Sequence, residues 1–346
     1  MDRDDHPAPP RAPSQLPLFG GHPATGPGAA GPVGDRVAPW PAVKAATTLD
    51  GATAAFHEHL LRAGKTENTR LGFASDLRLL AQFLGHGRPI GQIDVHDLQR
   101  FLTWLLEHRG EPCSAKSYAR RVTTLKVFFA WLAAEGARAD DPALPLVHRR
   151  AVAPLPLVLT DTQVDALLGT AAAIRGRDQA PDPRPELLVR LLLDTGLKKG
   201  ELIRLKSADV QADPAAPSVL VRYDAPRFRA KERRVPFDAV LLPLLEAYRR
   251  RYNVGDDAPL FACTARNLEY VLEDIVRDAA LPERTSFETL RWTMALRAWR
   301  AGVPPEALSA RLGLSPITWA ETAQKLGLLA AGVGPASGVS ERFPSA

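Results

Sequence analysis

The C-terminal part of this chain lacks histidine and tyrosine. The last of its eight histidines is His148, and the last of its five tyrosines is Tyr270. The C-terminal half therefore has no imidazole for general acid–base catalysis. The residues after Tyr270 also have no phenol that could act as a nucleophile.

Cysteine and long apolar runs are scarce as well. Cys113 and Cys263 lie far apart and in no metal-binding or redox spacing, so we expect two reduced thiols. We expect no metal and no cofactor. No stretch approaches the ~18–20 apolar residues of a membrane span. The N-terminus has no basic-then-apolar signal pattern. The sequence therefore favours a cytoplasmic protein without membrane contact.

The chain is mildly basic, with a net charge of +5 and a pI near 9.3. Its positive charge is concentrated in two stretches. Residues 114–150 hold seven Lys/Arg against three Asp/Glu, and residues 222–251 hold nine against four. Such stretches fit either a polyanionic partner or two solvated faces.

Residues 1–45 are rich in proline, with ten of the 31 prolines. A segment of this composition buries too little apolar surface to offset its ordering entropy, so we expect a disordered tail. Within it, the pentapeptide Gln15-Leu16-Pro17-Leu18-Phe19 gathers three large apolar side chains.

Residues 46–147 show helical periodicity. Four apolar stripes with spacings of three and four residues each precede a glycine, which predicts a four-helix domain. The stripes are Phe56/Leu60/Leu61, Leu77/Leu80/Phe83/Leu84, Leu98/Phe101/Leu102/Leu105/Leu106 and Val122/Leu125/Phe128/Phe129/Leu132.

A proline-rich, basic run over residues 148–157 is typical of a linker, and Thr160–Gln163 then forms a capping box that opens a second domain over 158–332. Residues 218–223 and 233–237 predict a two-stranded hairpin. Residues 333–346 are expected to be a flexible tail. Helices are expected over roughly 186–194, 200–205, 239–252, 265–279, 285–301, 304–312 and 316–330.

The order of these segments resembles the tyrosine recombinase (phage integrase, Xer-type) family over about residues 48–330. The second domain carries the more specific motifs, which are Asp194-Thr195-Gly196-Leu197-Lys198-Lys199-Gly200-Glu201-Leu202, Lys231-Glu232-Arg233-Arg234-Val235-Pro236, Thr289-Leu290-Arg291 and Leu312-Gly313-Leu314-Ser315. In the first domain the matching positions include Thr69, Phe73, Asp76-Leu77, Asp97-Leu98, Arg120-Arg121, Phe128-Phe129 and Asp141-Pro142-Ala143. The resemblance implies a mainly α fold: a four-helix SAM-like core-binding domain, then a mostly helical catalytic-like domain with a small antiparallel sheet.

In that family, two arginines hold a DNA phosphate, a hairpin lysine and histidines transfer protons, and a tyrosine attacks phosphorus. Carried over by position, only the second arginine of this set is intact here, while the family's acidic residue in the first motif is present at Glu201. The family positions fall on Lys198, Phe228, Glu288, Arg291 and Leu314, and the tyrosine position falls at or near Ala323. Arg227, Arg229 and Lys231 are the alternatives for the hairpin lysine. Loss of one preorganised donor can cost about 10²–10³ in rate, and several are replaced. We therefore expect no intact catalytic set.

Lys198 and Arg291 could still bind phosphate. The alternative is that Arg291 forms a buried ion pair with Glu201 or Glu288. DNA contacts are expected from one face of the last helix of the first domain and from the basic hairpin. The residues are Lys116, Arg120, Arg121, Lys126, Arg227, Arg229 and Lys231.

The tail pentapeptide resembles the motif with which bacterial proteins bind the sliding clamp. An extended segment would insert Leu16, Leu18 and Phe19, next to Gln15, into an apolar pocket. The alternative is a chance apolar cluster.

Three functions follow. The leading one is a cleavage-deficient DNA-binding protein of this family in DNA recombination, integration or maintenance. The second is an active site-specific recombinase whose site is diverged or completed by another copy or a paralogous subunit. The third is an adaptor recruited by the sliding clamp. Each implies double-stranded DNA as a partner and a place at the nucleoid.

Overall fold

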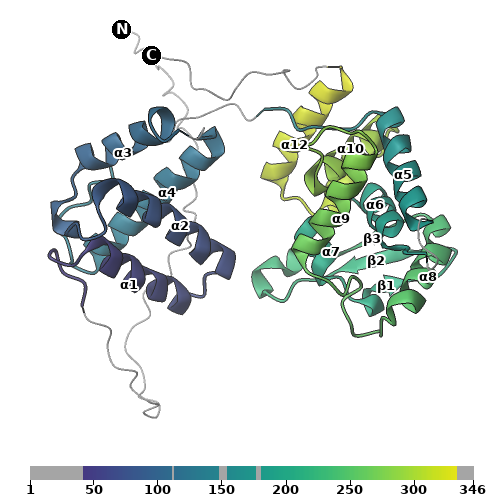
Figure 1. Cartoon of the computed structure of the whole chain (residues 1–346), viewed down its shortest axis with the longest axis horizontal. Coiled ribbons are helices and arrows are strands. Elements are labelled where there is room, and N and C mark those ends of the chain that lie inside the picture. Colours follow the sequence, from purple (N-terminus) through teal and green to yellow (C-terminus); the bar gives the residue numbers. More distant parts are fainter. Residues whose placement is uncertain (1–41, 111–112, 148–153, 177–180, 333–346) are drawn as a thin grey trace, which may run out of the picture. The chain divides into compact units, whose positions relative to one another are not determined.

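The computed structural model describes residues 42–110, 113–147, 154–176 and 181–332. These residues divide into two compact units, each with its own core (Figure 1). The first unit holds the early helices and the second holds the sheet and the later helices. The tail motif Gln15, Leu16, Leu18 and Phe19 lies outside the described residues, as do residues 148–153 of the expected linker.

Four α-helices are described before residue 135, as the periodicity predicts, and the first unit holds three of them and the fourth from Arg121 onward. They are α1 (Leu49–Arg62), α2 (Glu67–Leu84), α3 (Val95–Glu107) and α4 (Ala115–Ala134). Side chains at the N-caps Thr48, Thr66 and Asp94 accept hydrogen bonds from backbone N–H groups of the first turns. The C-cap of α2 is Gly85, whose φ of 98° is a conformation that glycine adopts at little energetic cost.

The packed chain begins earlier than its composition predicted. Residue 45 was assigned to the disordered tail, yet the carbonyl oxygen of Ala45 accepts a 2.8 Å hydrogen bond from Gly91 N. A Cβ on Gly91 would lie 2.8 Å from the Cβ of Ala45. Ile90 N also donates to the carbonyl oxygen of Thr47 at 2.9 Å, so the backbone at residues 45–47 is held against the segment around Ile90.

Aromatic side chains dominate the core of the first unit. Phe56 of α1 meets Phe128 of α4 edge-on with ring centroids 5.3 Å apart, and it also contacts Phe73 and Trp131. Phe56 and Phe128 are almost fully buried. Burial of one such ring contributes about 1.5–3 kcal/mol, so these contacts join α1, α2 and α4.

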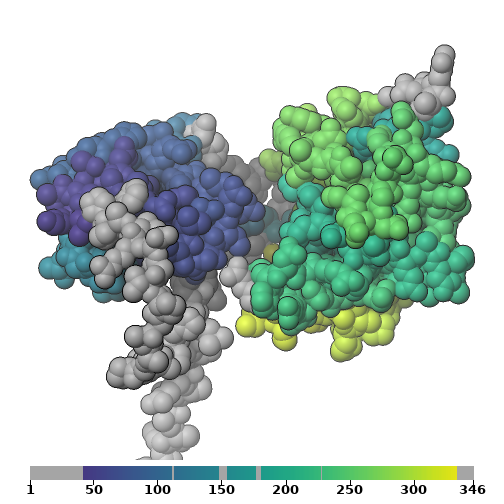
Figure 2. Space-filling view, turned by 90° about the horizontal axis from the view of Figure 1, so that it is seen from below, coloured from purple at the N-terminus to yellow at the C-terminus, as the bar shows by residue number. Residues whose placement is uncertain are grey.

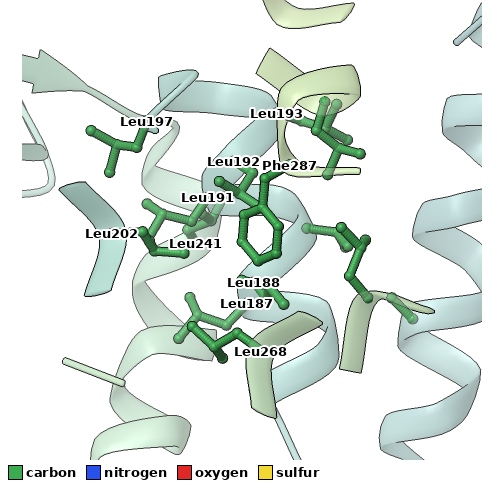
Figure 3. Packing of buried hydrophobic residues seen from close by; sticks show 14 of the residues in the cluster. Leu187, Leu188, Leu191, Leu192, Leu193, Leu197, Leu202, Leu241, Leu268 and Phe287 are labelled. Atoms are coloured by element: carbon green, nitrogen blue, oxygen red, sulfur yellow. The ribbon is translucent and has the colours of Figure 1, made fainter. Parts of the chain in front are cut away.

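The second unit is built around helix α6, which packs against α5, α8, α9 and α10 and against β3. Figure 3 shows leucines of α6, among them Leu188 and Leu192, packed close to Phe287. The α-helices described in this unit are α5 (Asp161–Arg175), α6 (Arg184–Thr195), α7 (Lys199–Arg204), α8 (Leu242–Tyr252), α9 (Ala265–Asp278), α10 (Phe287–Arg300), α11 (Pro305–Leu312) and α12 (Pro316–Ala330).

The predicted capping box is present at the start of α5. Thr160 Oγ1 accepts from Gln163 N at 3.3 Å, and Gln163 Oε1 accepts from Thr160 N at 2.9 Å. Two backbone donors at the helix start are thereby satisfied.

The sheet has three antiparallel strands in the order β1 (Val210–Gln211), β2 (Ser218–Val221) and β3 (Arg233–Pro236). The predicted pairing of β2 with β3 is confirmed, with Val219 opposite Val235. The sequence did not reveal β1, which is too short for a period-two pattern. A 3₁₀ turn, η3 (Pro226–Lys231), lies in the segment that connects β2 to β3.

A second apolar cluster joins α10, α11 and α12. Met294, Leu308, Leu312 and Leu326 are buried in it, and Trp292, Trp299 and Trp319 pack against it. The three tryptophans are thus partly buried at the edge of this cluster. The mainly helical fold class with a small antiparallel sheet is confirmed. Among the helices that the structure describes, none is sufficiently long and apolar to span a membrane.

Candidate functional site

Two turns frame the candidate site. The first lies between α6 and α7, where Gly196 takes a left-handed conformation with φ 63°. The second lies between α11 and α12, where Gly313 has φ 60°. Side chains from β3 and α10 connect these turns, and they carry most of the charge of the site.

Glu201 of α7 is the acidic centre of the site. Its carboxylate accepts hydrogen bonds from both terminal nitrogens of Arg233, at 3.2 and 3.0 Å, and from the hydroxyl of Tyr223. It also accepts a 2.9 Å bond from Lys198 N. Burial alone would raise the pKa of Glu201, but Arg233, Tyr223 and the N–H of Lys198 outweigh it and lower the pKa to about 2.

Arg233 is held in place by the second turn. Its Nε donates to the carbonyl oxygen of Arg311 at 2.7 Å. A Cβ on Gly313 would lie 2.6 Å from Arg233 Nη1. Glycine at 313 therefore serves both the left-handed turn and the close packing of the guanidinium.

Arg291 is buried, with 6% of its surface exposed. Its two terminal nitrogens donate to the backbone carbonyls of Gly196 and Leu312, the second at 2.6 Å. Burial lowers the pKa of its guanidinium, although the negative charges of Glu201 and Glu288 act in the opposite direction. Arg291 thus ties the α6–α7 turn to the end of α11.

Neither of the two ion pairs considered for Arg291 is formed within the described part of the chain. Glu201 pairs with Arg233 instead. Glu288 accepts a 3.0 Å hydrogen bond from Trp292 Nε1, one turn along α10. The buried ion pair offered as the alternative role for Arg291 is therefore not formed, because its terminal nitrogens donate to backbone carbonyls and not to carboxylates.

Lys198 lies half-buried at the start of α7. Burial lowers the pKa of its ammonium group, and the positive charges of Arg291, Lys231 and Arg233 lower it further, against the effect of Glu201. In the described chain no carboxylate lies within ion-pair distance of this ammonium. Lys198 is thus a cation with both other cations and the carboxylate of Glu201 near it.

The other family positions hold side chains without acid–base chemistry. Phe228 lies in η3, where its ring centroid is 5.8 Å from that of Tyr223. Leu314 packs against the cluster of α10, α11 and α12. Ala323 is half-buried on α12, whose atoms lie on the surface of the second unit (Figure 2, yellow).

The predicted basic face of α4 is only partly formed. Lys116 and Arg120 are exposed. Lys126 is half-buried, and its Nζ donates to the carbonyl oxygen of Leu144 at 2.8 Å. Arg121 is buried, with its Nε 3.6 Å from Asp76 Oδ1.

Placing Arg121 among the DNA contacts was therefore wrong. Position 121 precedes the buried Leu125 and Phe128 by four and seven residues, and such spacings lie on one face of a helix. Arg121 thus faces the core of its unit. Position 120 is rotated away from that face, and it shares the exposed side with Lys116, four residues earlier.

In the second unit, Arg229 is exposed and Lys231 is half-buried. The side chain of Arg227 lies outside the described set. Among the described residues, no group of three or more His, Cys, Asp or Glu side chains could hold a metal ion.

Arg233, Tyr223 and Arg311 were not singled out from the sequence. Strand alternation could have indicated Arg233, because it shares a face of β3 with the buried Val235. No sequence pattern indicated that Tyr223 would reach Glu201, since that contact joins residues 22 apart.

Comparison with known proteins agrees with this fold. The family model described as phage integrase, N-terminal SAM-like domain, matches residues 54–136. The model described as phage integrase family matches residues 158–322. The tyrosine recombinase XerC of Mycobacterium leprae (strain TN) is 36% identical over 199 residues, which are 56% of this chain and 62% of that protein. XerC of Mycobacterium sp. (strain JLS) is 32% identical over 194 residues, 55% of this chain and 61% of that protein. The chain thus spans less than two thirds of the length of these relatives.

Two solved structures share the fold. One is the Tn1549 transposon integrase in complex with transposon right end DNA, at 21% identity and a TM-score of 0.62, covering 81% of this chain and 94% of that chain. The other is a lambda integrase dimer bound to a COC′ core site, at 16% identity and a TM-score of 0.63, covering 81% of this chain and 78% of that chain.

Proposed function

Because this chain belongs to the phage integrase family of tyrosine recombinases, we propose that it binds double-stranded DNA without cleaving it. One observation carries the proposal. The position that the family resemblance assigns to the nucleophilic tyrosine holds Ala323, and no tyrosine follows Tyr270. A recombinase of this type needs that phenol to form a covalent link with phosphorus.

The phenol of Tyr223 is present near the site, and it is a poor substitute. Burial raises its pKa, and its hydrogen bond to the carboxylate of Glu201 raises it further. A raised pKa makes the phenolate rarer at neutral pH. Glu201, with a pKa of about 2, is too weak a base to remove the phenolic proton.

The hydrogen bonds of Arg291, the arginine that is retained from the family, also support a loss of cleavage. A guanidinium that stabilises a transition state must direct its donors at the phosphate. The terminal nitrogens of Arg291 donate to Gly196 and Leu312. Lys198, in place of the other arginine, keeps its charge but offers no bidentate fork.

Exposed cations support DNA binding. Lys116, Arg120 and Arg229 are accessible for phosphate contacts. The Tn1549 integrase was solved with DNA and the lambda integrase as a DNA-bound dimer, so we include duplex DNA and self-association in the proposal.

Sequencing of DNA recovered with the protein from cells tests this function. A single palindromic motif is expected for a recombinase-like or regulatory DNA-binding protein. Absence of any DNA enrichment would contradict it. Diffuse binding that follows replication would instead favour recruitment by the sliding clamp.

A second proposal concerns the segment Gln15–Phe19, whose apolar pattern suits the clamp pocket. A peptide of residues 14–20 is expected to bind the bacterial sliding clamp with at best micromolar affinity, about −8 kcal/mol, since ordering a tail is costly. Replacement of Leu18 and Phe19 by alanine should abolish binding. If the wild-type peptide and the alanine variant bind the clamp equally, the clamp does not recognise this motif.

A further inference from the structure

Two aromatic rings, each with a cation beside it, lie next to the charged site. The rings of Tyr223 and Phe228 are tilted by 54° with centroids 5.8 Å apart. The guanidinium carbon of Arg204 lies 5.6 Å from the Tyr223 centroid, and the Nζ of Lys231 lies 5.2 Å from the Phe228 centroid. Each ring therefore has a cation within cation–π distance.

The backbone around these rings is fixed. Tyr223 N donates to Glu232 Oε1 at 3.0 Å, and the Tyr223 hydroxyl donates to Glu201. Phe228 N donates to the carbonyl oxygen of Ala225 at 2.9 Å inside the 3₁₀ turn. A platform held in this way loses little conformational entropy when a ligand binds. Both rings are half-buried, so part of each surface remains open.

The rings adjoin the cations of the candidate site. Lys231, which covers Phe228, is near enough to Lys198 for its charge to lower the pKa of that ammonium group. Proteins that bind unpaired nucleic acid combine aromatic faces for the bases with cations for the backbone. The same combination occurs here within one unit.

The side chain of Phe228 differs in chemistry from the residue that the family has at this position. The family resemblance assigns a lysine to this position, and a lysine offers a point charge but no π face. In a matched duplex the faces of the bases are covered by their neighbours. A base that is already unpaired costs least to bring onto an aromatic surface.

We infer that Tyr223 and Phe228 form a stacking platform for an unpaired base of DNA, with Arg204, Lys231 and Lys198 beside its backbone phosphates. The inference rests on the proposed DNA binding. It gives that binding a preferred substrate class, namely duplexes that contain a bulged, mismatched or single-stranded base.

The test compares two duplexes with the same base pairs, one fully matched and one that carries a single additional, bulged 2-aminopurine. Binding of the full chain is measured by anisotropy, and base stacking by quenching of 2-aminopurine fluorescence. We expect the bulged duplex to bind more tightly, and Phe228→Leu to reduce this preference by roughly five- to a hundredfold, the range of base–aromatic stacking.

Two further variants separate stacking from damage to the fold. Phe228→Trp keeps a π face and should retain both the preference and the quenching. Tyr270→Leu removes another aromatic–cation pair, since Tyr270 lies under Arg266 on α9, and should leave the preference unchanged.

Equal affinity of the wild-type chain for both duplexes, without quenching, would overturn this inference and leave the proposed DNA binding intact. An undiminished preference in Phe228→Leu would overturn it as well. Failure of the wild-type chain to bind either duplex would overturn both proposals together.

Discussion

Arg233 and Glu201 form a bidentate ion pair, with Nη1 3.2 Å from Oε1 and Nη2 3.0 Å from Oε2. The Arg233 side chain is 9% exposed and that of Glu201 is 1% exposed. The pair joins β3 to α7 inside the second unit. Replacement of only one partner of such a buried pair lowers the stability of the fold, because the remaining charge is left without a partner.

The first prediction concerns acid stability. The pKa of Glu201 in the folded chain is about 2, below the ordinary glutamate value of 4.5. Its stabilising effect is therefore complete above about pH 4.5 and is lost as the pH falls towards 2. Glu201→Gln should lower the free energy of unfolding at pH 7 by about 3 kcal/mol and flatten the dependence on pH below 4.5. Urea unfolding across this pH range measures both effects.

Glu246→Gln is the matched control. Glu246 pairs with Arg250 on the exposed side of α8, and such a surface pair contributes about 0–1 kcal/mol. If the two variants lose the same stability at pH 7, the buried pair has no special role.

The second prediction concerns Arg291. Arg291→Met removes the donors for two buried carbonyl groups, so the free energy of unfolding should fall by about 2–5 kcal/mol. Arg297→Met on the same helix removes only an exposed pair with Asp161 and should change it by less than about 1 kcal/mol. Chemical denaturation compares them. A stable Arg291→Met protein would show that this guanidinium does not hold the two turns together.

Much of the fold could be predicted because its signals are local. The stripes of the first unit, the capping box at Thr160 and the pairing of β2 with β3 each depend on spacing within a short segment. The small strand β1 was missed because two residues carry no periodicity.

The site was less predictable because its contacts are long-range. Position-by-position comparison located Lys198 and Arg291 in the site, but not the carbonyl partners of Arg291. Those partners lie 95 and 21 residues away in sequence. Arg121 was assigned to the same helical face as Lys116 and Arg120, although one residue corresponds to a rotation of about 100° around the helix. Its neighbours at i+4 and i+7 show that it faces inward.

The third prediction concerns the DNA-contacting surface. Joint replacement of Lys116, Arg120 and Arg229 by glutamine should weaken duplex binding to any sequence. The slope of log K against log salt should become shallower by about 0.9 for each phosphate that the protein no longer neutralises. Anisotropy titrations over a range of salt measure this.

Arg266, Arg277 and Arg297 provide a control of equal charge. All three are exposed and already pair with carboxylates. Their joint replacement by glutamine should leave the salt slope unchanged. Equal weakening of binding in both triple variants would mean that net charge, and not this surface, determines affinity.

The fourth prediction concerns restoration of cleavage. Lys198→Arg, Phe228→Lys, Glu288→His, Leu314→His and Ala323→Tyr together should give weak cleavage, whereas each single change should give none. Catalytic groups that act as a unit are strongly non-additive. Gel analysis of a labelled duplex detects the product. Cleavage by a single-change variant would show that the assignment of family positions is incorrect.

The most direct test of cleavage deficiency is a search for a covalent protein–DNA adduct. The wild-type chain is incubated with a suicide substrate of its own DNA site, nicked near the scissile position, and the mixture is denatured. We predict DNA binding before denaturation and no adduct after it, because the resemblance assigns Ala323 to the nucleophile position and the hydroxyl of Tyr223 donates its proton to Glu201. A denaturation-resistant adduct would contradict this prediction, and its absence in Tyr223→Phe would identify the substitute nucleophile.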